Sequence, residues 1–539
     1  MVGESVTDVS VRTEGKIHVF YEDKSMSEKQ FVIGVDAGTS NIKAVLFDLQ
    51  GNELASHGIA MKLDAPLPNT AEQDMQEIWD NVCTCIAEIS RDLNPDQCAG
   101  IGITSHGDGT WMIDAQGSPV RKGIFWCDGR AADVVDRWHQ SGIARKAFAL
   151  CGTAVNTGTQ ACQLAWLKEH EPESLERAGC IFHCKDWIFY KLTGRRTTDE
   201  TDESLPMLNM SSRQYDDRLF DLFELGKLRD KFPDVLPASR NIGTLHEEAA
   251  GRLGLPTGMT VGSGPMDVSA CALGVGAIRH GDGSTILGTA GIHQVTMDSA
   301  DLTPEMVGMT LCHAPSDKWL RLMAVNSATP NVDWFLRELG AGIRQQAESG
   351  GASVFDEVDR AIQSVPIGSR GVMYHPYLLP NGERAPFIKP AAKAAFSGLS
   401  DTNVAADLLR AVYEGVAFAM VDCYRHMPIE VKAITLSGGG SKSSVWCQIV
   451  ADAMGTPIQI TAGTEFGAKG AAMNVAVATG VFESYEQAVS EMVTADKTYH
   501  PDPKHHAHYQ KLYPLYKKIA DCSAEGWDLR AELQDELAQ

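Results

Sequence analysis

Two short segments, far apart in the chain, place glycine and threonine in turns that could bind phosphate. The first is Phe31-Val-Ile-Gly-Val-Asp36-Ala-Gly38-Thr39-Ser40, and the apolar run that follows it contains Lys43. The second is Ser284-Thr-Ile-Leu-Gly288-Thr289-Ala-Gly291. Backbone N–H groups and threonine hydroxyls in such turns can hold phosphate oxygens, and Asp36 stands where a carboxylate could hold Mg²⁺ directly or through water. Two turns of one design predict two related half-domains that face one nucleotide.

A third glycine cluster lies in Leu436-Ser437-Gly438-Gly439-Gly440-Ser441. We expect it to connect a strand at 431–436 to a helix at 444–455. Three consecutive glycines allow the backbone to approach a flat ligand closely. The alternative is a tight structural turn, although such a turn does not require three glycines.

The common nucleotide-binding motifs are not found in the sequence. The string Gly463-Thr-Glu-Phe-Gly467-Ala-Lys469-Gly470 has the wrong spacing for a Walker A loop, and no serine or threonine follows its lysine. No Gly-x-Gly-x-x-Gly string opens a helix after a strand, so a dinucleotide-binding fold is not supported.

The elements that must position these turns alternate between strands and helices. A chain of 539 residues is too long for one ordinary core. We expect three strands in 31–60, a helix in 71–91 and a strand at 99–104. Helices should dominate 130–193, a strand should precede Asp267, and a helix should cover 268–274. A domain boundary is expected near 275, and alternation continues to about 480 before a helical tail at 505–535. This order predicts two α/β domains with mixed sheets and a cleft between them.

Composition limits the functional class. Hydrophobic residues make up 44% and charged residues 22%, which is typical of a globular enzyme. The formal net charge of −23 argues against a nucleic-acid partner and against binding to an anionic membrane. The sequence contains no apolar run of 18 residues, and residues 1–30 are mixed and charged, so we interpret them as an arm rather than a signal peptide. The 13 cysteines form no Cys-x-x-Cys pair, which favours reduced thiols in a cytoplasmic protein.

Taken together, these segments resemble the FGGY carbohydrate kinases of the actin-like superfamily, over about residues 31 to 515. Five further segments carry the resemblance: Trp126-Cys-Asp128-Gly-Arg130, Tyr377-Leu-Leu-Pro-Asn-Gly382-Glu383-Arg384-Ala-Pro386, Phe396-Ser-Gly-Leu-Ser, Asp407-Leu-Leu-Arg-Ala-Val-Tyr-Glu414-Gly415 and Thr159-Gln-Ala-Cys-Gln163. The last is only partly kept, because Gln163 stands where many relatives carry lysine.

The resemblance implies a fold and a division into domains. It implies an α/β protein with two actin-like, ribonuclease H-like domains whose mixed sheets flank a cleft for nucleotide and substrate. After an arm at 1–30, residues 31–275 would form the domain that binds the sugar or polyol and phosphate. Residues 276–539 would bind ATP and end in the helical tail.

The resemblance also implies ATP and Mg²⁺ as cofactors, with Asp36 at the metal. The residues expected to bind ATP and its phosphates are Gly38, Thr39, Ser40, Lys43, Gly288, Thr289, Gly438, Gly439, Gly440 and Ser443. Asp267 matches the catalytic aspartate of the family, where a carboxylate would accept the proton of the acceptor hydroxyl. The alternative for Asp267 is a helix N-cap without a catalytic role.

The acceptor pocket is expected around Thr104-Ser105-His106-Gly107-Asp108-Gly109-Thr110-Trp111, where relatives bind substrate hydroxyls. We expect the acceptor to contact His106, Asp108, Trp111, Asp128, Arg130 and Asp267. Each has an alternative: Asp108 could form an Asx turn, Trp111 could be a core residue, and Asp128 and Arg130 could form a salt bridge. His106 has no second ligand at metal-binding spacing, so a pocket-edge role is favoured.

This pocket string resembles the erythritol-kinase and L-xylulose-kinase side of the family. We therefore predict ATP-dependent phosphorylation of a small sugar or polyol, with erythritol as the first choice and L-xylulose or another pentulose as the alternative. A kinase for linear ketones of the autoinducer type and a non-catalytic sugar sensor also stay open. Family members are often dimers, so the resemblance allows a homodimer.

Overall fold

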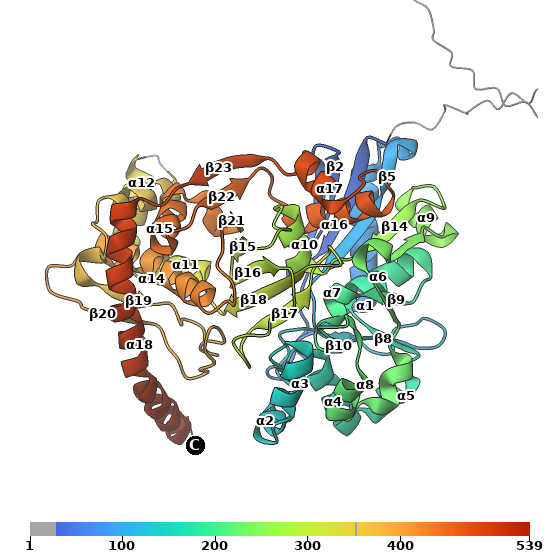
Figure 1. The fold of residues 1–539 in the computed structure, drawn as a ribbon, viewed down its shortest axis with the longest axis horizontal. Coiled ribbons are helices and arrows are strands. Elements are labelled where there is room, and N and C mark those ends of the chain that lie inside the picture. Colours follow the sequence, from blue (N-terminus) through green and yellow to red (C-terminus); the bar gives the residue numbers. More distant parts are fainter. Residues whose placement is uncertain (1–28, 351–352, 539) are drawn as a thin grey trace, which may run out of the picture.

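The computed structural model describes residues 29–350 and 353–538, so the predicted arm at 1–30 lies outside them apart from Lys29 and Gln30. The described chain forms two lobes, each built around a β-sheet that contains both parallel and antiparallel pairs (Figure 1). The predicted α/β architecture with two mixed sheets is confirmed.

The first sheet has six strands in the order β13-β14-β5-β1-β2-β3. Their bounds are β1 (Phe31–Ala37), β2 (Asn41–Asp48), β3 (Glu53–Ala60), β5 (Cys98–Ser105), β13 (Ile242–Thr244) and β14 (Thr260–Ser263). Strand β5 runs parallel to both β1 and β14, whereas the β1–β2 and β2–β3 pairs are antiparallel. The central strands are apolar, so both faces of the sheet must be covered.

Three helices cover one face of this sheet: α1 (Met75–Ser90), α6 (Cys184–Thr193) and α9 (Glu247–Leu253). In α1 the apolar side chains recur with helical spacing, and Ile78, Val82, Ile86 and Ile89 are all buried in the core against the sheet. Asp74 caps the helix by accepting hydrogen bonds from the N–H groups of Gln76 and Glu77.

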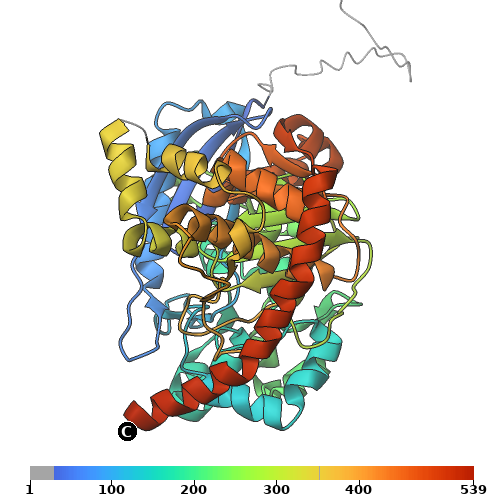
Figure 2. The same ribbon diagram turned by 90° about the vertical axis from the view of Figure 1, so that its left-hand side faces the viewer.

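The second sheet has seven strands in the order β17-β18-β16-β15-β21-β22-β23. Their bounds are β15 (Asp282–Leu287), β16 (Gly291–Met297), β17 (Met309–Cys312), β18 (Trp319–Val325), β21 (Ala433–Ser437), β22 (Ile458–Thr461) and β23 (Ala495–Tyr499). The large core of this lobe lies between the sheet and helices that include α11 (Thr329–Glu338), α13 (Val354–Gln363), α14 (Ala405–Arg425), α15 (Ser444–Met454) and α18 (Pro503–Ala538). The short helix α12 (Ala341–Gly350) packs beside α11 and α13. Helix α18, the predicted tail, runs along the outside of this lobe to the C-terminus (Figure 2).

Short helices and two-stranded sheets form a separate layer beside the first sheet, with their own apolar core. The helices are α2 (Ala132–Gln140), α3 (Ile143–Cys151), α4 (Gln160–His170), α5 (Pro172–Arg177), α7 (Glu200–Glu203) and α8 (Asp217–Leu222). The paired strands are β4 (Glu72–Gln73) with β7 (Gly123–Ile124), β6 (Trp111–Ile113) with β8 (Cys180–Phe182), β9 (Thr197–Asp199) with β12 (Asp234–Leu236), and β10 (Leu208–Asn209) with β11 (Gln214–Tyr215). In the other lobe β19 (Met373–His375) pairs with β20 (Ala395–Ser397).

Two helices between the sheets are exchanged between the halves of the chain. Helix α10 (Asp267–Gly274) directly follows the first sheet, yet Val268 and Ala272 lie in a core with Leu320 and Leu322 of the second sheet. Helix α16 (Phe466–Ala478) follows the second sheet and packs on the first, together with α17 (Tyr485–Met492) (Figure 1). The stretch from 466 to 492 therefore packs on the first lobe, and the assignment of residues 276–539 to one domain stays a prediction.

The exchanged helices approach their neighbours with backbone against backbone. A Cβ atom at Gly34 of β1 would overlap the carbonyl of Ala468, and one at Gly102 of β5 would overlap that of Ala471. Between the two helices, a Cβ at Gly470 would overlap the Ala270 carbonyl. Only glycine fits at these positions, because any larger side chain would push the helix away from the sheet.

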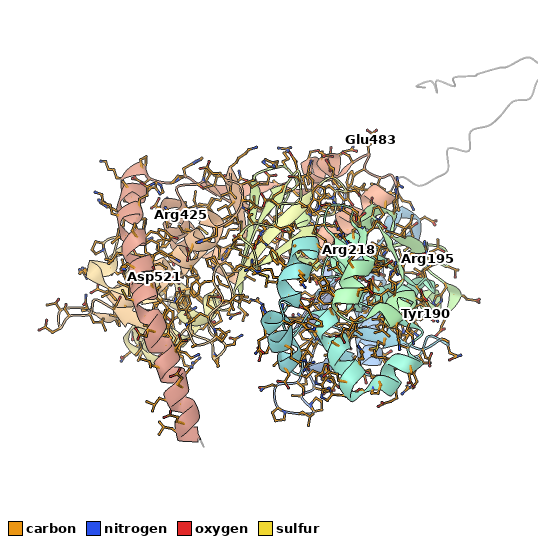
Figure 3. The ribbon with its side chains drawn as sticks, turned by 60° about the horizontal axis from the view of Figure 1, so that its bottom comes forward. Tyr190, Arg195, Arg218, Arg425, Glu483 and Asp521 are labelled. Atoms are coloured by element: carbon orange, nitrogen blue, oxygen red, sulfur yellow. The ribbon has the colours of Figure 1, made fainter. Side chains whose placement is uncertain are left out.

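Charged side chains of both signs lie on the outside of both lobes, as Arg218 and Glu483 on one lobe and Arg425 and Asp521 on the other illustrate (Figure 3). Among the helices of the described residues, none combines the length and the apolar character needed to cross a membrane.

We expect the change Gly470→Ala to lower the free energy of unfolding by about 1–3 kcal/mol, the usual cost of overpacking a filled core. Urea denaturation would measure this loss. The matched control is Gly251→Ala in α9, where a Cβ would meet open space. Because alanine favours helix over glycine, the control should gain about 0.5–1 kcal/mol. Equal effects at the two sites would contradict the close approach.

Candidate active site

The two predicted phosphate turns connect the antiparallel pairs β1–β2 and β15–β16, which occupy matching central positions in the two sheets. In the first turn the Gly38 N–H donates to the Asn41 carbonyl at 3.0 Å, while Thr39 and Ser40 are exposed. The Thr39 hydroxyl accepts a hydrogen bond from the indole N–H of Trp126 at 3.1 Å. Trp126 therefore contacts the first phosphate turn, whereas the sequence indicated it only as part of a family motif.

The second turn is held by the start of α11. The Gly288 carbonyl accepts from the N–H of Thr329 at 3.0 Å, and the Thr289 carbonyl accepts from the Ala328 N–H at 2.9 Å. Because these carbonyls are engaged on the protein side, an anion at the turn would meet amide groups and the exposed Thr289 hydroxyl. The Gly288 N–H itself donates to the Ala290 carbonyl at 3.1 Å, so the exposed Thr289 hydroxyl is a donor that the turn could offer to phosphate.

The three glycines after β21 serve different purposes. A Cβ at Gly438 or Gly440 would overlap Leu287, the last residue of β15, so these two glycines let the cluster pack beside the second turn. Gly439 is exposed and has open space around its Cα. Ser443 caps α15 and donates its hydroxyl to Asp359 at 2.8 Å. Its side chain is thus committed to internal contacts, which disfavours a direct role for this hydroxyl in binding ATP.

Asp36 lies close to the charged side chains of Asp267, Glu465 and Lys43. Its Oδ1 is buried and has no hydrogen-bond partner among the described residues. Burial, and then the nearby charges of Asp267 and Glu465, raise the pKa of Asp36 to about 7, against the opposing effect of Lys43. Lys43 itself forms an ion pair with Glu465 at 2.8 Å. A predicted phosphate-binding lysine is thus paired with a carboxylate in the absence of nucleotide.

Asp267 is the first residue of α10, while Met266 occupies the N-cap position. Its Oδ1 accepts a hydrogen bond from the Val268 N–H at 2.7 Å. Burial raises the pKa of Asp267 to about 7, the charge of Asp202 adds to the rise, and the N–H groups of Val268 and Gly107 oppose it. A carboxyl group with a pKa near neutrality is suited to accept a proton at physiological pH.

The carboxylate oxygen that Asp36 offers would fit a Mg²⁺ ion that is held mainly by phosphates. The described residues contain no group of three His, Cys, Asp or Glu side chains arranged for a metal. Mg²⁺ commonly binds through one or two carboxylates, several waters and the substrate phosphates. The unpartnered Oδ1 of Asp36 offers one such carboxylate oxygen beside the first phosphate turn.

Asp108 lies beside Asp267 in the predicted acceptor pocket. It is buried with φ 59°, and its Oδ1 has no hydrogen-bond partner among the described residues. Burial raises the pKa of Asp108 well above its ordinary value, Asp202 and Asp267 add to the rise, and Arg384 opposes it. Arg384 comes from the other lobe and donates its Nε–H to the Ala324 carbonyl at 3.0 Å. The second lobe therefore brings a positive charge close to Asp108.

Two of the predicted acceptor contacts are buried side chains. Trp111 is fully buried in the core cluster of the first lobe and packs against Gly109 and Gly123. His106 is buried against Trp111 and Phe125, with ring centroids 5.2 and 4.5 Å away. Burial lowers the pKa of His106 to about 3, so this imidazole is neutral. The predicted contacts of Trp111 and His106 with the acceptor stay predictions.

Asp128 and Arg130 form the salt bridge that was the alternative to acceptor binding. Asp128 is completely buried and accepts hydrogen bonds from the Ala71 N–H and from the Arg130 backbone and guanidinium. Arg130 also donates to Glu72 at 2.7 Å. These polar groups connect the β4 region to the loop after Trp126 and position that loop. The predicted contacts of Asp128 and Arg130 with the acceptor stay predictions.

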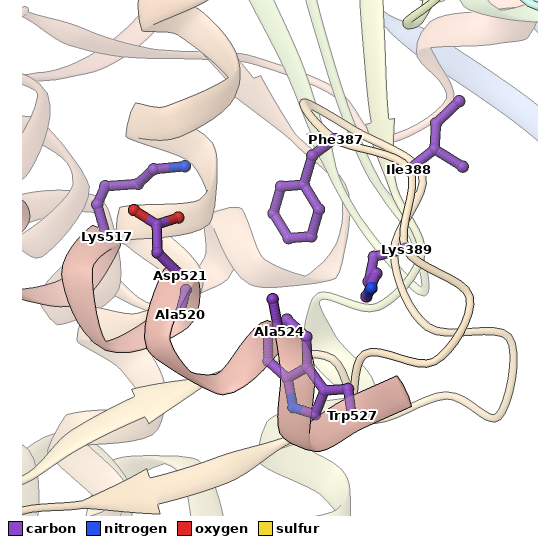
Figure 4. Close-up of a pocket in the computed structure, with 8 residues that line it drawn as sticks. All are labelled: Phe387, Ile388, Lys389, Lys517, Ala520, Asp521, Ala524 and Trp527. Atoms are coloured by element: carbon purple, nitrogen blue, oxygen red, sulfur yellow. The ribbon is translucent and has the colours of Figure 1, made fainter. Parts of the chain in front are cut away.

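A separate cavity of about 220 Å³ lies away from these residues, between the loop at 387–389 and helix α18 (Figure 4). Phe387 and Trp527 form apolar walls, while Lys517 and Asp521 contribute opposite charges. Lys517 is already paired with Asp422 at 2.7 Å. This mixed lining does not indicate one class of ligand.

Comparison with known proteins agrees with the geometry of the cleft. Family models described as FGGY family of carbohydrate kinases, N-terminal domain and C-terminal domain, match residues 31–274 and 283–479. An erythritol kinase of Brucella abortus is 31% identical over 94% of this chain and 98% of its own length. An L-xylulose/3-keto-L-gulonate kinase of Escherichia coli is 29% identical over 91% and 96%.

Solved structures share the fold. A ligand-bound xylulose kinase from Lactobacillus acidophilus superimposes with a TM-score of 0.84 and 25% identity, covering 92% of this chain and 99% of its own. A Plasmodium falciparum glycerol kinase with ADP has a TM-score of 0.81 over 92% and 99% of the chains, and its 19% identity supports the fold alone.

The raised pKa of Asp267 predicts how stability changes with pH. The folded protein holds this proton more tightly than the unfolded chain, whose pKa is near 3.8. Ionisation therefore penalises the fold increasingly from about pH 4 to pH 7. Asp267→Asn should stabilise the ligand-free protein by about 1–3 kcal/mol at pH 8, at 1.4 kcal/mol per pKa unit, and by much less near pH 4.5.

Urea unfolding at the two pH values measures this difference. The exposed Asp496→Asn serves as the control and should give the same free energy of unfolding as the wild type at each pH. A gain for Asp267→Asn that does not depend on pH would contradict the predicted titration.

Proposed function

This chain belongs to the FGGY family of carbohydrate kinases, and we propose that within this family it transfers the γ-phosphoryl group of ATP to a hydroxyl of erythritol. Kinase activity on a sugar or polyol follows from the family, which uses ATP as the phosphate donor. The observation that carries the assignment of the site is the position of Asp267. It begins α10, whose Val268 packs against the second sheet, and it lies close to Asp36, Gly107 and Asp108.

Asp267 acts as the general base in this proposal. Its carboxylate accepts the proton of the acceptor hydroxyl, the hydroxyl oxygen attacks the γ-phosphorus, and ADP leaves. A pKa of about 7 leaves a useful fraction of the carboxylate ionised and still basic enough to take the proton. The dense packing around the start of α10 keeps the carboxylate in place.

The two turns and the glycine cluster bind the nucleotide. The turns at Gly38-Thr39-Ser40 and at Gly288-Thr289 hold the phosphates from opposite lobes. They do so through their hydroxyls and through amides other than those of Gly38 and Gly288, which donate to the Asn41 and Ala290 carbonyls. Residues 438–440 approach the adenosine, with Gly439 as the glycine that has open space around it. Binding of phosphates frees Lys43 from Glu465 to neutralise charge. Asp36 would hold Mg²⁺, which when bound offsets the negative charge of the phosphates.

Two observations support a short polyol as acceptor. Asp108 offers an unpartnered carboxylate oxygen to neighbouring hydroxyls, and Arg384 approaches it from the opposite lobe. Among the compared relatives, the erythritol kinase is 31% identical and the L-xylulose kinase 29%. These values are close, so a pentulose is the second candidate. Trp111 is buried in the core cluster of the first lobe and gives no support to one acceptor over the other.

Asp267→Asn should lower kcat by about 10²–10⁴, the usual contribution of a general base. Binding of Mg-ATP should persist, because the phosphate turns and Asp36 are unchanged. Coupled ADP-release assays and isothermal titration calorimetry measure the two properties. Asp496→Asn is the control and should keep full activity. Full activity of Asp267→Asn would exclude Asp267 as the base.

A panel of acceptors tests the substrate with the same assay. It contains erythritol, glycerol, xylitol, both enantiomers of xylulose and ribulose, and a linear dihydroxy-diketone. We expect the highest kcat/KM with erythritol. A higher value with a pentulose or the diketone would replace erythritol with that acceptor. If ATP binds but every acceptor fails, the sensor interpretation is favoured.

Asp108→Asn tests the proposed acceptor contact. Loss of a charged hydrogen bond of about 1.5–3 kcal/mol should raise KM for the best acceptor by about 10- to 100-fold. KM for ATP should stay within about twofold, because Asp108 lies in the acceptor pocket. An unchanged KM for the acceptor would remove Asp108 from the pocket.

A further inference from the structure

Three residues connect the first sheet to the proposed base. Strand β14 ends at Ser263 and α10 begins at Asp267, so the segment 264–266 sets where the carboxylate lies. Met266 is buried, and its N–H needs a partner inside the protein. The connection contains no charged side chain of its own. Its position must therefore be fixed by residues from other elements.

The partner of the Met266 N–H is the hydroxyl of Thr201, at 2.8 Å. Thr201 lies in α7 and is buried. Its hydroxyl donates to Asp199 Oδ1 at 2.5 Å, and its own N–H donates to the same oxygen at 2.8 Å. Because the hydroxyl proton points to Asp199, the oxygen lone pairs are available to the Met266 N–H.

Asp199 is in turn anchored by a buried lysine. Its Oδ2 lies 2.6 Å from Nζ of Lys185, which also contacts Asp186 at 2.6 Å and Asp202 at 3.2 Å. All four side chains are completely buried. Burial alone would lower the pKa of Lys185, but the three carboxylates raise it well above its ordinary value. A permanent ammonium group therefore fixes the Asp199 carboxylate.

The opposite side of the same connection is held by α16. The Asn474 amide donates to the Gly264 carbonyl at 3.0 Å and to the Ala238 carbonyl at 3.1 Å. Its Oδ1 accepts a hydrogen bond from the Tyr485 hydroxyl at 2.6 Å. Asn474 from the second half of the chain therefore hydrogen-bonds to the connection at Gly264, and Thr201 from the first half hydrogen-bonds to it at Met266.

We propose that Thr201 is a positioning residue for phosphoryl transfer, because its hydroxyl links the Lys185–Asp199 ion pair to the backbone amide that precedes the base. This role rests on the proposed function of Asp267. Without the hydroxyl, the Met266 amide loses its partner and the start of α10 can shift. A shift of about 1 Å in a reacting group can reduce the rate by about 100-fold.

Thr201→Val tests this role because it keeps the shape of the side chain and removes the hydroxyl. We expect kcat to fall at least about tenfold, with KM for ATP and for the acceptor changing less than about threefold. Thr201→Ser, which restores the hydroxyl, should recover most of kcat. Selective loss of kcat with rescue by serine separates positioning from a general loss of structure.

Thr198→Val is the matched control. Thr198 is buried in the adjacent strand β9, and its hydroxyl has no hydrogen-bond partner among the described residues. This change should leave kcat within about twofold. If Thr201→Val does not fold, Thr201→Cys takes its place, since a thiol is a weak acceptor for the Met266 N–H. The same loss of kcat is expected.

The positioning role is overturned if the folded Thr201 variant keeps kcat within twofold, or if Thr198→Val loses as much as Thr201→Val. It fails separately from the proposed function. Full activity of Asp267→Asn would remove both the base and its positioning residue. An inactive Asp267→Asn together with a fully active Thr201→Val would remove the positioning role alone.

Discussion

Backbone contact between α16, β1, β5 and α10 is the constraint on which the rest of this structure depends. Carbonyl groups of the helix lie where the side chains of Gly34 and Gly102 would be, so helix and sheet are as close as a polypeptide allows. The same region of close contact also positions the groups proposed for catalysis. A Cβ at Gly467 would overlap the Asp36 carboxylate, Glu465 precedes the helix, and Asn474 holds the connection to Asp267. Groups from both halves of the chain therefore meet within one rigid core.

The sequence predicted the local elements well, because their signals are local. Glycine and threonine between two apolar runs specify a hairpin turn, and both predicted turns are found between antiparallel strands. Helical spacing of apolar residues predicted α1, and the charged, amphipathic tail predicted α18. Asp36 lies near the end of β1, and Asp108 and Asp267 follow β5 and β14, which are parallel neighbours in the same sheet. The roles of these residues stay predictions until the variants are tested.

Other features depend on contacts between distant segments, which one sequence does not reveal. In the sequence, the string from Gly463 to Gly470 suggested only a comparison with a phosphate-binding loop. In the structure, its small residues allow α16 to approach its neighbours closely. The sequence left two alternatives for Trp111, a pocket wall and a core residue, and its packing against Gly123 in the core cluster is a contact that the sequence does not reveal. The Asp128–Arg130 salt bridge was an alternative that the sequence offered, whereas the ion pairs of Arg130 with Glu72 and of Lys185 with Asp199 join residues that sequence spacing alone could not match. The exchanged positions of α10 and α16 likewise depend on contacts between distant parts of the chain, so they could not be predicted from local patterns.

The exchanged position of α16 has a consequence for how this protein is made. Strands β1 and β2 are synthesised first, yet the apolar face that carries Val32, Val45 and Phe47 is covered by a helix near the end of the chain. During translation this surface stays uncovered until residues 466–492 have been synthesised. The N-terminal lobe therefore cannot complete its core as an independent unit. Such contacts between distant residues slow folding, and the uncovered sheet is exposed to aggregation meanwhile. A ribosome that stops before residue 466 would release a lobe that is incomplete, not a smaller stable domain.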